Sequence, residues 1–216
     1  TGRYCWRSRL KKGVLWGFES PLIEPDRPTL ASVLKSAGYA TAAIGKWHLG
    51  LGWSTVTGGE PLPDGTNVDY SQRVTGGPNE LGFDRSFLIS ASLDMPPYCF
   101  IEDGHTVGIP SEEKSPYHPQ QRKGLMVPGW RDEEVDLTFA ERAVEFISRH
   151  VAQKPKVPFF LYLTPSAPHR PCVPPDTVRD CSDAGLRGDM VTLVDRVVGQ
   201  VADTVDRLGV GEDTLI

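Results

Sequence analysis

The chain has 216 residues, a formal net charge of −5 at pH 7, and 39% hydrophobic and 24% charged side chains. This composition is typical of a folded globular domain and argues against a nucleic-acid partner, because no basic run is long enough to follow a phosphate backbone. No apolar run approaches the roughly 18 residues that a membrane span requires, so no membrane partner is expected.

The first predicted elements are a helix and a strand in the N-terminal quarter. Thr29 suits the N-cap of a helix, and Gly38 suits its C-terminal stop. Between them, apolar side chains recur at helical spacing: Leu30, Val33, Leu34 and Ala37. The segment "YATAAI" then predicts a short buried strand at residues 39–44.

A long stretch rich in Gly, Pro and polar residues follows at 51–134. Within it, only "FDRSFLISASL" at residues 83–93 predicts a strand. A connection of this length inside a compact domain is usually functional or an elaborated insertion. We therefore expect residues 51–134 to form a loop-rich insertion.

A second helix and a second apolar strand are predicted in the last third of the chain. "DLTFAERAVEFISRHV" at 136–151 predicts a helix, and Thr138 and Glu141 have capping-box spacing at its start. Its expected apolar stripe consists of Leu137, Ala140, Val144, Ile147 and Val151. "PFFLYLT" at 158–164 is an apolar run bounded by prolines, and it predicts a strand.

A third helix is expected from Leu186 to Leu208, with Gly209 ending it. Its predicted core face consists of Met190, Leu193, Val194, Val197, Val201 and Val205. "DTLI" at 213–216 predicts the beginning of another strand. Helices that alternate with uniformly apolar strands indicate an α/β layer fold with a largely parallel sheet.

Lys46, His48 and His169 are the leading candidates for chemistry. Lys46 and His48 follow the first strand in "GKWHLG", and they would project to one face if the backbone stayed extended. His169 follows another strand in "PSAPHRP". One amine and two imidazoles at the same sheet edge could bind a tetrahedral oxyanion and pass protons. The alternative is that both are hydrogen-bonded loop histidines and that Lys46 is solvated.

Other polar residues carry weaker signals. Asp94, in "LDMPPY", either lines a substrate pocket or forms a turn. His150 is expected at a helix end, where its charge suits the helix dipole, and no partner is evident for the remaining histidines, His105 and His118. Four cysteines are too few for a disulfide scaffold; Cys172 and Cys181 could pair, or both could be isolated thiols.

Three motifs in order, "TGRY", "GKWHLG" and "PFFLYLTPSAPHRP", resemble the type I sulfatases of the alkaline-phosphatase-like superfamily. The most specific part is "LKSAGYATAAIGKWHLG", and the resemblance covers essentially the whole chain. It implies an α/β sandwich with a largely parallel central sheet flanked by helices, incomplete at both ends. Residues 1–216 would then be a partial catalytic domain.

The resemblance also implies hydrolysis of sulfate esters, with a sulfated carbohydrate or a small sulfate ester as substrate. In the family, a cysteine in a Cys-x-Pro-x-Arg motif becomes formylglycine, whose hydrate attacks sulfur, and a calcium ion polarises the sulfate. Lys46 and His48 match residues that contact the sulfate and the formylglycine, and His169 matches one that faces the leaving group. Family members usually act in the periplasm, in lysosomes or outside the cell.

Cys5 resembles the family nucleophile but does not fit its motif. Arg9 lies four residues on, yet Arg7 occupies the position that requires proline, and Cys5 follows "TGR" instead of preceding it. We therefore expect the formylglycine upstream of Thr1 and no calcium ligands within residues 1–216. The isolated chain is expected to be inactive, because it lacks both the N-terminal nucleophile and metal segment and the C-terminal part of the domain.

Two alternatives remain open from the sequence. Phosphodiesterases and phosphonate hydrolases share the scaffold and could carry a similar Lys and His, in which case the residue at the nucleophile position would differ. A degenerate homologue could instead bind anions or carbohydrates without catalysis. Replacement of Lys46 or His48 would then leave the activity of the full-length protein unchanged.

Overall fold

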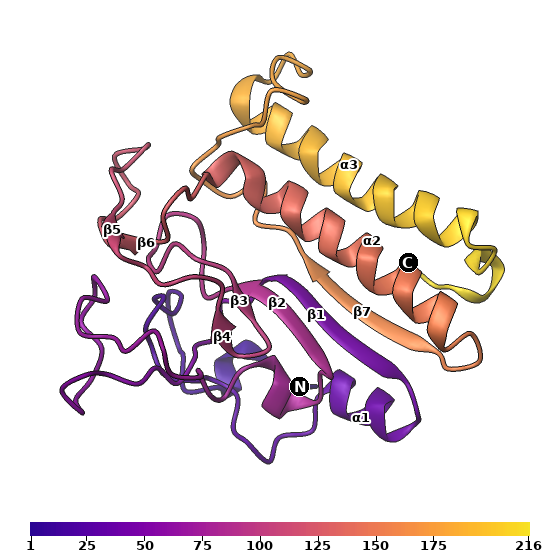
Figure 1. Cartoon of the computed structure of the whole chain (residues 1–216), viewed down its shortest axis with the longest axis horizontal. Helices are drawn as coiled ribbons and strands as arrows, with labels where there is room; N and C mark the ends of the chain where they lie inside the picture. Colours follow the sequence, from indigo (N-terminus) through magenta and orange to yellow (C-terminus); the bar gives the residue numbers. More distant parts are fainter.

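The computed structural model describes all residues from Thr1 to Ile216 and is built around a five-stranded sheet of order β4-β3-β2-β1-β7 (Figure 1). β1 (Ala40–Lys46) runs parallel to both β2 (Arg85–Ile89) and β7 (Phe159–Thr164). The short strands β3 (Ile101–Glu102) and β4 (His105–Thr106) extend the sheet in antiparallel fashion. The predicted α/β fold with a largely parallel sheet is therefore confirmed.

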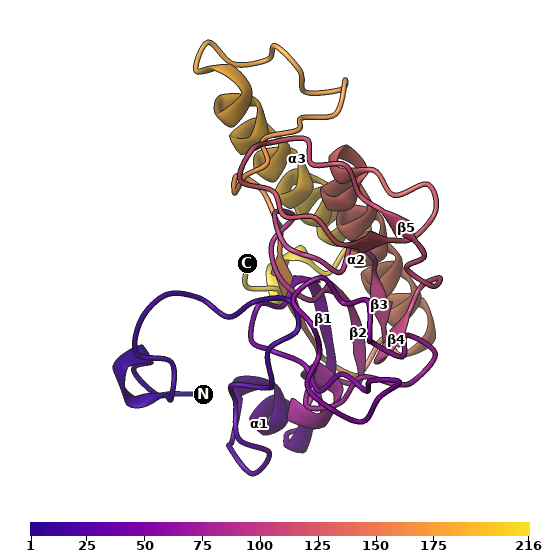
Figure 2. The same cartoon turned by 90° about the vertical axis from the view of Figure 1, so that its left-hand side faces the viewer.

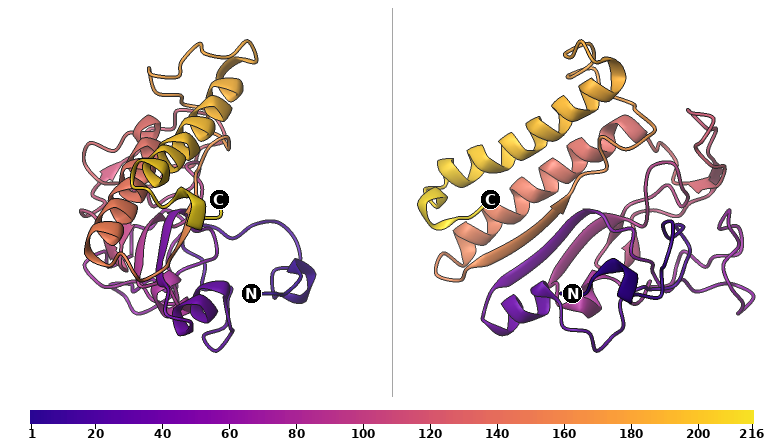
Figure 3. Two further views of the ribbon diagram at one scale, coloured as in Figure 1. Left: turned by 90° about the vertical axis from the view of Figure 1, so that its right-hand side faces the viewer. Right: turned by 180° about the vertical axis from the view of Figure 1, so that it is seen from behind.

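Helices cover both faces of this sheet. α2 (Val135–Gln153) and α3 (Gly185–Arg207) run side by side on one face (Figures 1 and 3). α1 (Leu30–Ser36) packs against β1 on the other face, near the N-terminal segment (Figure 2). None of the helices is long and apolar enough to cross a membrane.

The core is split by the sheet, as the alternation of side chains along β1 and β2 dictates. Ile44 and Phe87 pack with Phe139 of α2 on one face. Ala43 and Leu88 pack with Ala31 of α1 on the other. Burying a large apolar side chain contributes about 1.5–3 kcal/mol, so these two clusters hold the strand ends in a fixed frame.

α1 confirms the predicted cap but not the predicted apolar stripe. Thr29 Oγ1 accepts a hydrogen bond from the Ser32 amide at 3.0 Å, as an N-cap residue should. Only Ala31 is buried, whereas Leu30 and Val33 are 60% and 55% exposed. The helix is two turns long, its only buried side chain is the small Ala31, and Leu34 of the predicted stripe is half-buried.

α2 occupies the predicted residues but begins differently. A short 3-10 turn, Asp132–Glu134, leads into the helix at Val135. Thr138 therefore lies inside the helix, where its hydroxyl donates to the Glu134 carbonyl at 2.9 Å, and the predicted capping box is wrong. The buried face comprises Val135, Asp136, Phe139, Ala140, Ala143, Ile147 and His150, so only part of the predicted stripe is buried.

The rest of the chain agrees with the predictions except at its last residues. α3 buries five of its six predicted core residues, and Val194 is half-buried. Residues 213–216 form no strand, because no neighbouring strand pairs with them; Leu215 is 99% exposed. Between β1 and α2, most of the chain is irregular and includes only a small ribbon of β5 (Glu112–Glu113) and β6 (Leu125–Met126) besides β2–β4.

Candidate active site

The first pair of candidate residues lies where β1 ends. Lys46 is the last residue of the strand and is half-buried. The chain then turns, because His48 adopts a left-handed backbone conformation with φ of +54°. The extended backbone assumed from the sequence therefore stops before His48. Trp47 points into the core as expected, and its indole donates to the Gly50 carbonyl at 3.1 Å.

Gly45 lets β7 approach β1 at the site. Its φ is +124°, and a Cβ at this position would lie 2.1 Å from the Thr164 carbonyl oxygen. The Thr164 hydroxyl donates to the Lys46 carbonyl at 2.9 Å. The ends of the two strands are therefore fastened together, and the segment that follows β7 begins beside Lys46.

His169 is held at the same edge by a buried carboxylate. Asp136, in the first turn of α2, accepts hydrogen bonds from the amides of Ser166 at 2.6 Å and Ala167 at 2.9 Å. Burial raises the pKa of the Asp136 carboxyl, and the two amides oppose this effect. Two residues further on, the His169 ring Nδ1 lies 2.8 Å from the Arg170 carbonyl oxygen.

Asp94 occupies the centre of the arrangement. It follows β2, is 6% exposed, and its Oδ2 accepts from Arg122 Nη1 at 3.0 Å. Its Oδ1 makes no hydrogen bond and lies 3.9 Å from His169 Nδ1. Asp94 lies in a hydrogen-bonded turn, in which the Met95 amide donates to the Ser92 carbonyl at 3.0 Å, so the turn expected from the sequence is present. Its carboxylate makes no hydrogen bond to this turn and instead pairs with Arg122 beside His169.

The charges of these residues act on one another. Burial lowers the pKa of Lys46, and the negative charge of Asp94 opposes that shift. Burial also lowers the pKa of His48, the positive charges of Lys46 and His169 add to this, and Asp94 opposes it. An amine, two imidazoles and a carboxylate therefore share one electrostatic environment at the carboxyl edge of the sheet, and Lys46 is not a solvated surface lysine.

Each of the two imidazoles has one ring nitrogen that is not hydrogen-bonded within the chain. His48 Nε2 lies 2.8 Å from the Leu15 carbonyl, which only accepts, so this nitrogen carries the proton and Nδ1 is left free. The same reasoning assigns the proton of His169 to Nδ1, leaving its Nε2 free. Each histidine is thus hydrogen-bonded, as the alternative interpretation expected, and still presents an acceptor.

Sequence reasoning missed several polar groups around the site. Ser90 and Ser92 follow β2, Ser166 follows β7, and their buried hydroxyls have no hydrogen-bond partner within the chain. Buried polar atoms are normally paired, so these groups indicate a place that receives a polar ligand or another polar segment. The alternation of Ser90, Ser92 and Asp94 after an apolar strand was the available signal.

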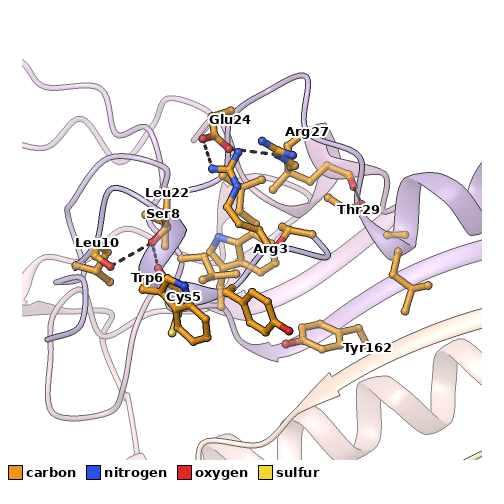
Figure 4. Close-up of a pocket in the computed structure, with 18 of the residues that line it drawn as sticks. Arg3, Cys5, Trp6, Ser8, Leu10, Leu22, Glu24, Arg27, Thr29 and Tyr162 are labelled. Atoms are coloured by element: carbon orange, nitrogen blue, oxygen red, sulfur yellow. Dashed lines mark hydrogen bonds and ion pairs between the residues drawn. The ribbon is translucent and has the colours of Figure 1, made fainter. Parts of the chain in front are cut away.

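A cavity lies elsewhere, between the N-terminal segment and the face of the sheet. It measures about 730 Å³ and is lined by Cys5, Trp6, Leu30 and Tyr162 among others (Figure 4). None of Lys46, His48 and His169 lines it. Cys5 is exposed here, away from the candidate residues, and Cys172 and Cys181 are both free thiols.

A parallel α/β sheet that gathers an amine and two imidazoles at its carboxyl edge defines a class of protein suited to binding oxyanions. Comparison with known proteins makes this specific, because the model of the Sulfatase family matches residues 8–216. The chain belongs to the sulfatase family. It is 31% identical, over its whole length, to an N-acetylgalactosamine-6-O-sulfatase of Bacteroides thetaiotaomicron, and it covers 46% of that protein.

Human arylsulfatase A is 27% identical over the whole chain, which covers 39% of it. A solved structure from work on the metabolism of multiple glycosaminoglycans by B. thetaiotaomicron superposes with a TM-score of 0.79 at 28% identity. That match covers 97% of this chain and 48% of the other. The chain thus has the alkaline-phosphatase-like fold of the sulfatases, and it spans less than half the length of these relatives.

Proposed function

We propose that this chain contributes to the active site of a sulfuric ester hydrolase, and that the complete protein hydrolyses sulfate esters. The observation that carries the proposal is the convergence of Lys46, His48 and His169 around Asp94. Membership of the sulfatase family supports the type of reaction. The relative that acts on N-acetylgalactosamine 6-sulfate, as its name says, favours a sulfated carbohydrate over a small sulfate ester.

Each residue has a role that follows from its environment. The Lys46 ammonium neutralises negative charge on the sulfate, and partial burial strengthens this attraction relative to bulk water. His48 contacts the attacking group, because its free Nδ1 can accept a hydrogen bond from a hydroxyl there. Once doubly protonated, His169 donates the proton on Nε2 to the leaving-group oxygen, while its Nδ1–H stays hydrogen-bonded to the Arg170 carbonyl. The Asp94 carboxylate favours the charged form of Lys46 and the protonated form of His48, and it lines the substrate pocket.

The nucleophile and the metal would come from residues outside this chain. No group of three or more His, Cys, Asp or Glu side chains here is arranged to hold a metal ion, so these residues do not fit a calcium site. Cys5 has arginine where the formylglycine motif needs proline and lines a cavity that excludes the site residues. In this proposal, residues 1–216 are a partial catalytic domain in which 51–134 is an insertion, and the isolated chain is inactive.

Replacing Lys46 or His48 in the complete protein tests the proposal. We expect Lys46→Ala and His48→Ala to lower kcat/KM for release of sulfate from a sulfated saccharide by about 10²-fold, because each removes a group aimed at transition-state charge. Lys35→Ala is the matched control, since Lys35 lies on α1 and pairs with Asp84. Unchanged rates in all three variants would contradict a catalytic role for Lys46 and His48, and a complete protein that binds the saccharide but releases no sulfate would support anion binding without catalysis.

A further inference from the structure

Trp16 is an exposed aromatic residue placed directly beside the candidate active site. Its side chain is 45% exposed. The preceding residue, Leu15, is buried, and its carbonyl oxygen accepts the hydrogen bond from His48 Nε2. The indole therefore lies one residue away from a direct contact with the site, and neither the proposed reaction nor the core uses it.

Arg122 connects this indole to the centre of the site. Its guanidinium carbon lies 4.1 Å from the centroid of the Trp16 ring, within the range of a cation–π contact. Its Nη1 donates to Asp94 Oδ2 at 3.0 Å. The Arg122 side chain remains 36% exposed, and its Nε and Nη2 groups donate to no acceptor in the chain. Two directional donors are thus left unused beside an exposed aromatic face.

The backbone that carries Trp16 is held from several sides. A Cβ on the next residue, Gly17, would lie 1.8 Å from the Pro96 carbonyl oxygen, so only glycine permits this approach. The Trp53 indole donates to the Gly17 carbonyl at 3.1 Å. The Trp16 amide donates to Glu19 Oε2 at 2.5 Å. The loop is fixed while its largest apolar side chain is left partly in water, which is the arrangement of a preorganised contact surface.

We propose that Trp16 and Arg122 form a subsite for a saccharide ring that carries or adjoins an acidic group. The apolar C–H face of a sugar ring packs on an indole, and a guanidinium binds a carboxylate or a second sulfate through paired hydrogen bonds. The subsite adjoins Asp94 and His169, so it would orient the sugar whose sulfate lies at Lys46. It rests on the proposed function and extends it to the recognition of the carbohydrate.

The test compares two ligands of the complete protein, a uronic acid–N-acetylgalactosamine-6-sulfate disaccharide and inorganic sulfate. We expect Trp16→Ala to raise KM for the disaccharide by about 10-fold or more, because a stacking surface is lost. Inhibition by inorganic sulfate should change by less than about two-fold, because sulfate has no ring to stack. Trp16→Phe should recover most of the loss. Unchanged disaccharide KM in Trp16→Ala would overturn the subsite.

Arg122 is tested with a variant that keeps its charge. Arg122→Lys preserves the ion pair with Asp94 but loses the planar set of guanidinium N–H donors. KM should therefore rise by about 5-fold for the disaccharide, and by less for the monosaccharide N-acetylgalactosamine 6-sulfate. Lys123→Ala is the matched control, because Lys123 is the adjacent, mostly exposed cation and pairs with Glu113. An equal rise in KM for both sugars, or an equal rise in KM in Lys123→Ala, would contradict a role for Arg122 in binding the acidic group.

The outcome also separates the subsite from the reaction. If the complete protein releases no sulfate, the proposed hydrolysis fails, and calorimetric binding of the same disaccharide to the wild type and to Trp16→Ala decides the subsite alone. Binding that weakens about 10-fold in the variant supports the subsite. Equal binding by both proteins, or no binding of the disaccharide at millimolar concentration, overturns it.

Discussion

Asp94 sets the charge balance of its neighbours, and this leads to a prediction for a single residue. Its carboxylate raises the pKa of His48 against the lowering effects of burial and Lys46. Asp94→Asn removes that negative charge, so the pKa of His48 should fall further below its ordinary value. NMR titration of the imidazole resonances measures this shift. Glu113→Gln, on the distant β5, should leave the titration unchanged, and a higher His48 pKa in Asp94→Asn would refute the assignment.

The depressed pKa of His48 also predicts how stability depends on pH. Between the folded-state pKa and the ordinary value of about 6.5, the unfolded chain binds the proton more readily than the folded one. Stability should therefore fall as the pH drops through that window. His48→Gln removes this contribution, so thermal unfolding between about pH 7.5 and 5.5 should show a smaller loss in Tm for the variant. An equal or larger loss would show that other groups dominate.

At the scale of single residues, the sequence pointed to candidate site residues that directly adjoin a strand. It gave no signal for residues that contact partners distant in the chain. Lys46, His48 and His169 each follow an apolar strand, and parallel strands bring their carboxyl ends together. The backbone turn at His48 was not foreseen, since nothing in "GKWHLG" requires a positive φ outside its glycines. Trp16 and Arg122 meet only because two loops fold over the same edge, and no local pattern encodes that contact.

Asp136 links an element to the site, because it fastens the segment after β7 to the first turn of α2. Asp136→Ala would leave the buried amides of Ser166 and Ala167 without their acceptor. Each unsatisfied group costs about 1–3 kcal/mol, so we expect the two amides to lower the free energy of unfolding by about 2–6 kcal/mol, measured by urea denaturation. Glu141→Ala, at an exposed position of the same helix, should cost less than about 0.5 kcal/mol. A similar cost for both variants would contradict the role of Asp136.

At the scale of elements, the sequence predicted where each helix lies. It predicted the buried face of α3, but it did not predict the start of α2 or the buried face of α1. The apolar periodicity of α3 identified its buried side because one face packs on α2 along its length. At α2, the capping spacing of Thr138 and Glu141 was misleading, because a 3-10 turn had already begun three residues before the helix. At α1, spacing marked Leu30 as a core residue, but Leu30 is exposed and Ala31 is the only buried residue of the helix.

The sheet of the whole molecule ends on one side in a long edge strand, β7, and on the other in the two-residue β4. β7 pairs only with β1, its Tyr162 side chain is 42% exposed, and Leu30 and Trp6 are exposed nearby around the cavity of Figure 4. Open strand edges and apolar patches promote association. We expect the 216-residue chain to aggregate on its own, measured by light scattering.

A lysine on that edge should slow the process. Tyr162→Lys places a charge on the open strand, and Val191→Lys places the same charge on the exposed side of α3. We expect the first substitution to reduce the rate of aggregation by several-fold and the second to have little effect. A wild-type chain that stays monodisperse and melts cooperatively would contradict the incompleteness of the domain.

The pairing of β1 with β7 has a consequence for how the protein is made. The hydroxyl of Thr164 and the carbonyl of Lys46 meet across 118 residues of chain. Closing so large a loop is entropically unfavourable and slow compared with forming helices. A nascent polypeptide that has emerged from the ribosome only as far as α2 holds Lys46 and His48 but cannot yet place His169 beside them. The proposed site therefore cannot be complete until β7 and the segment that follows it have been synthesised and have closed the sheet.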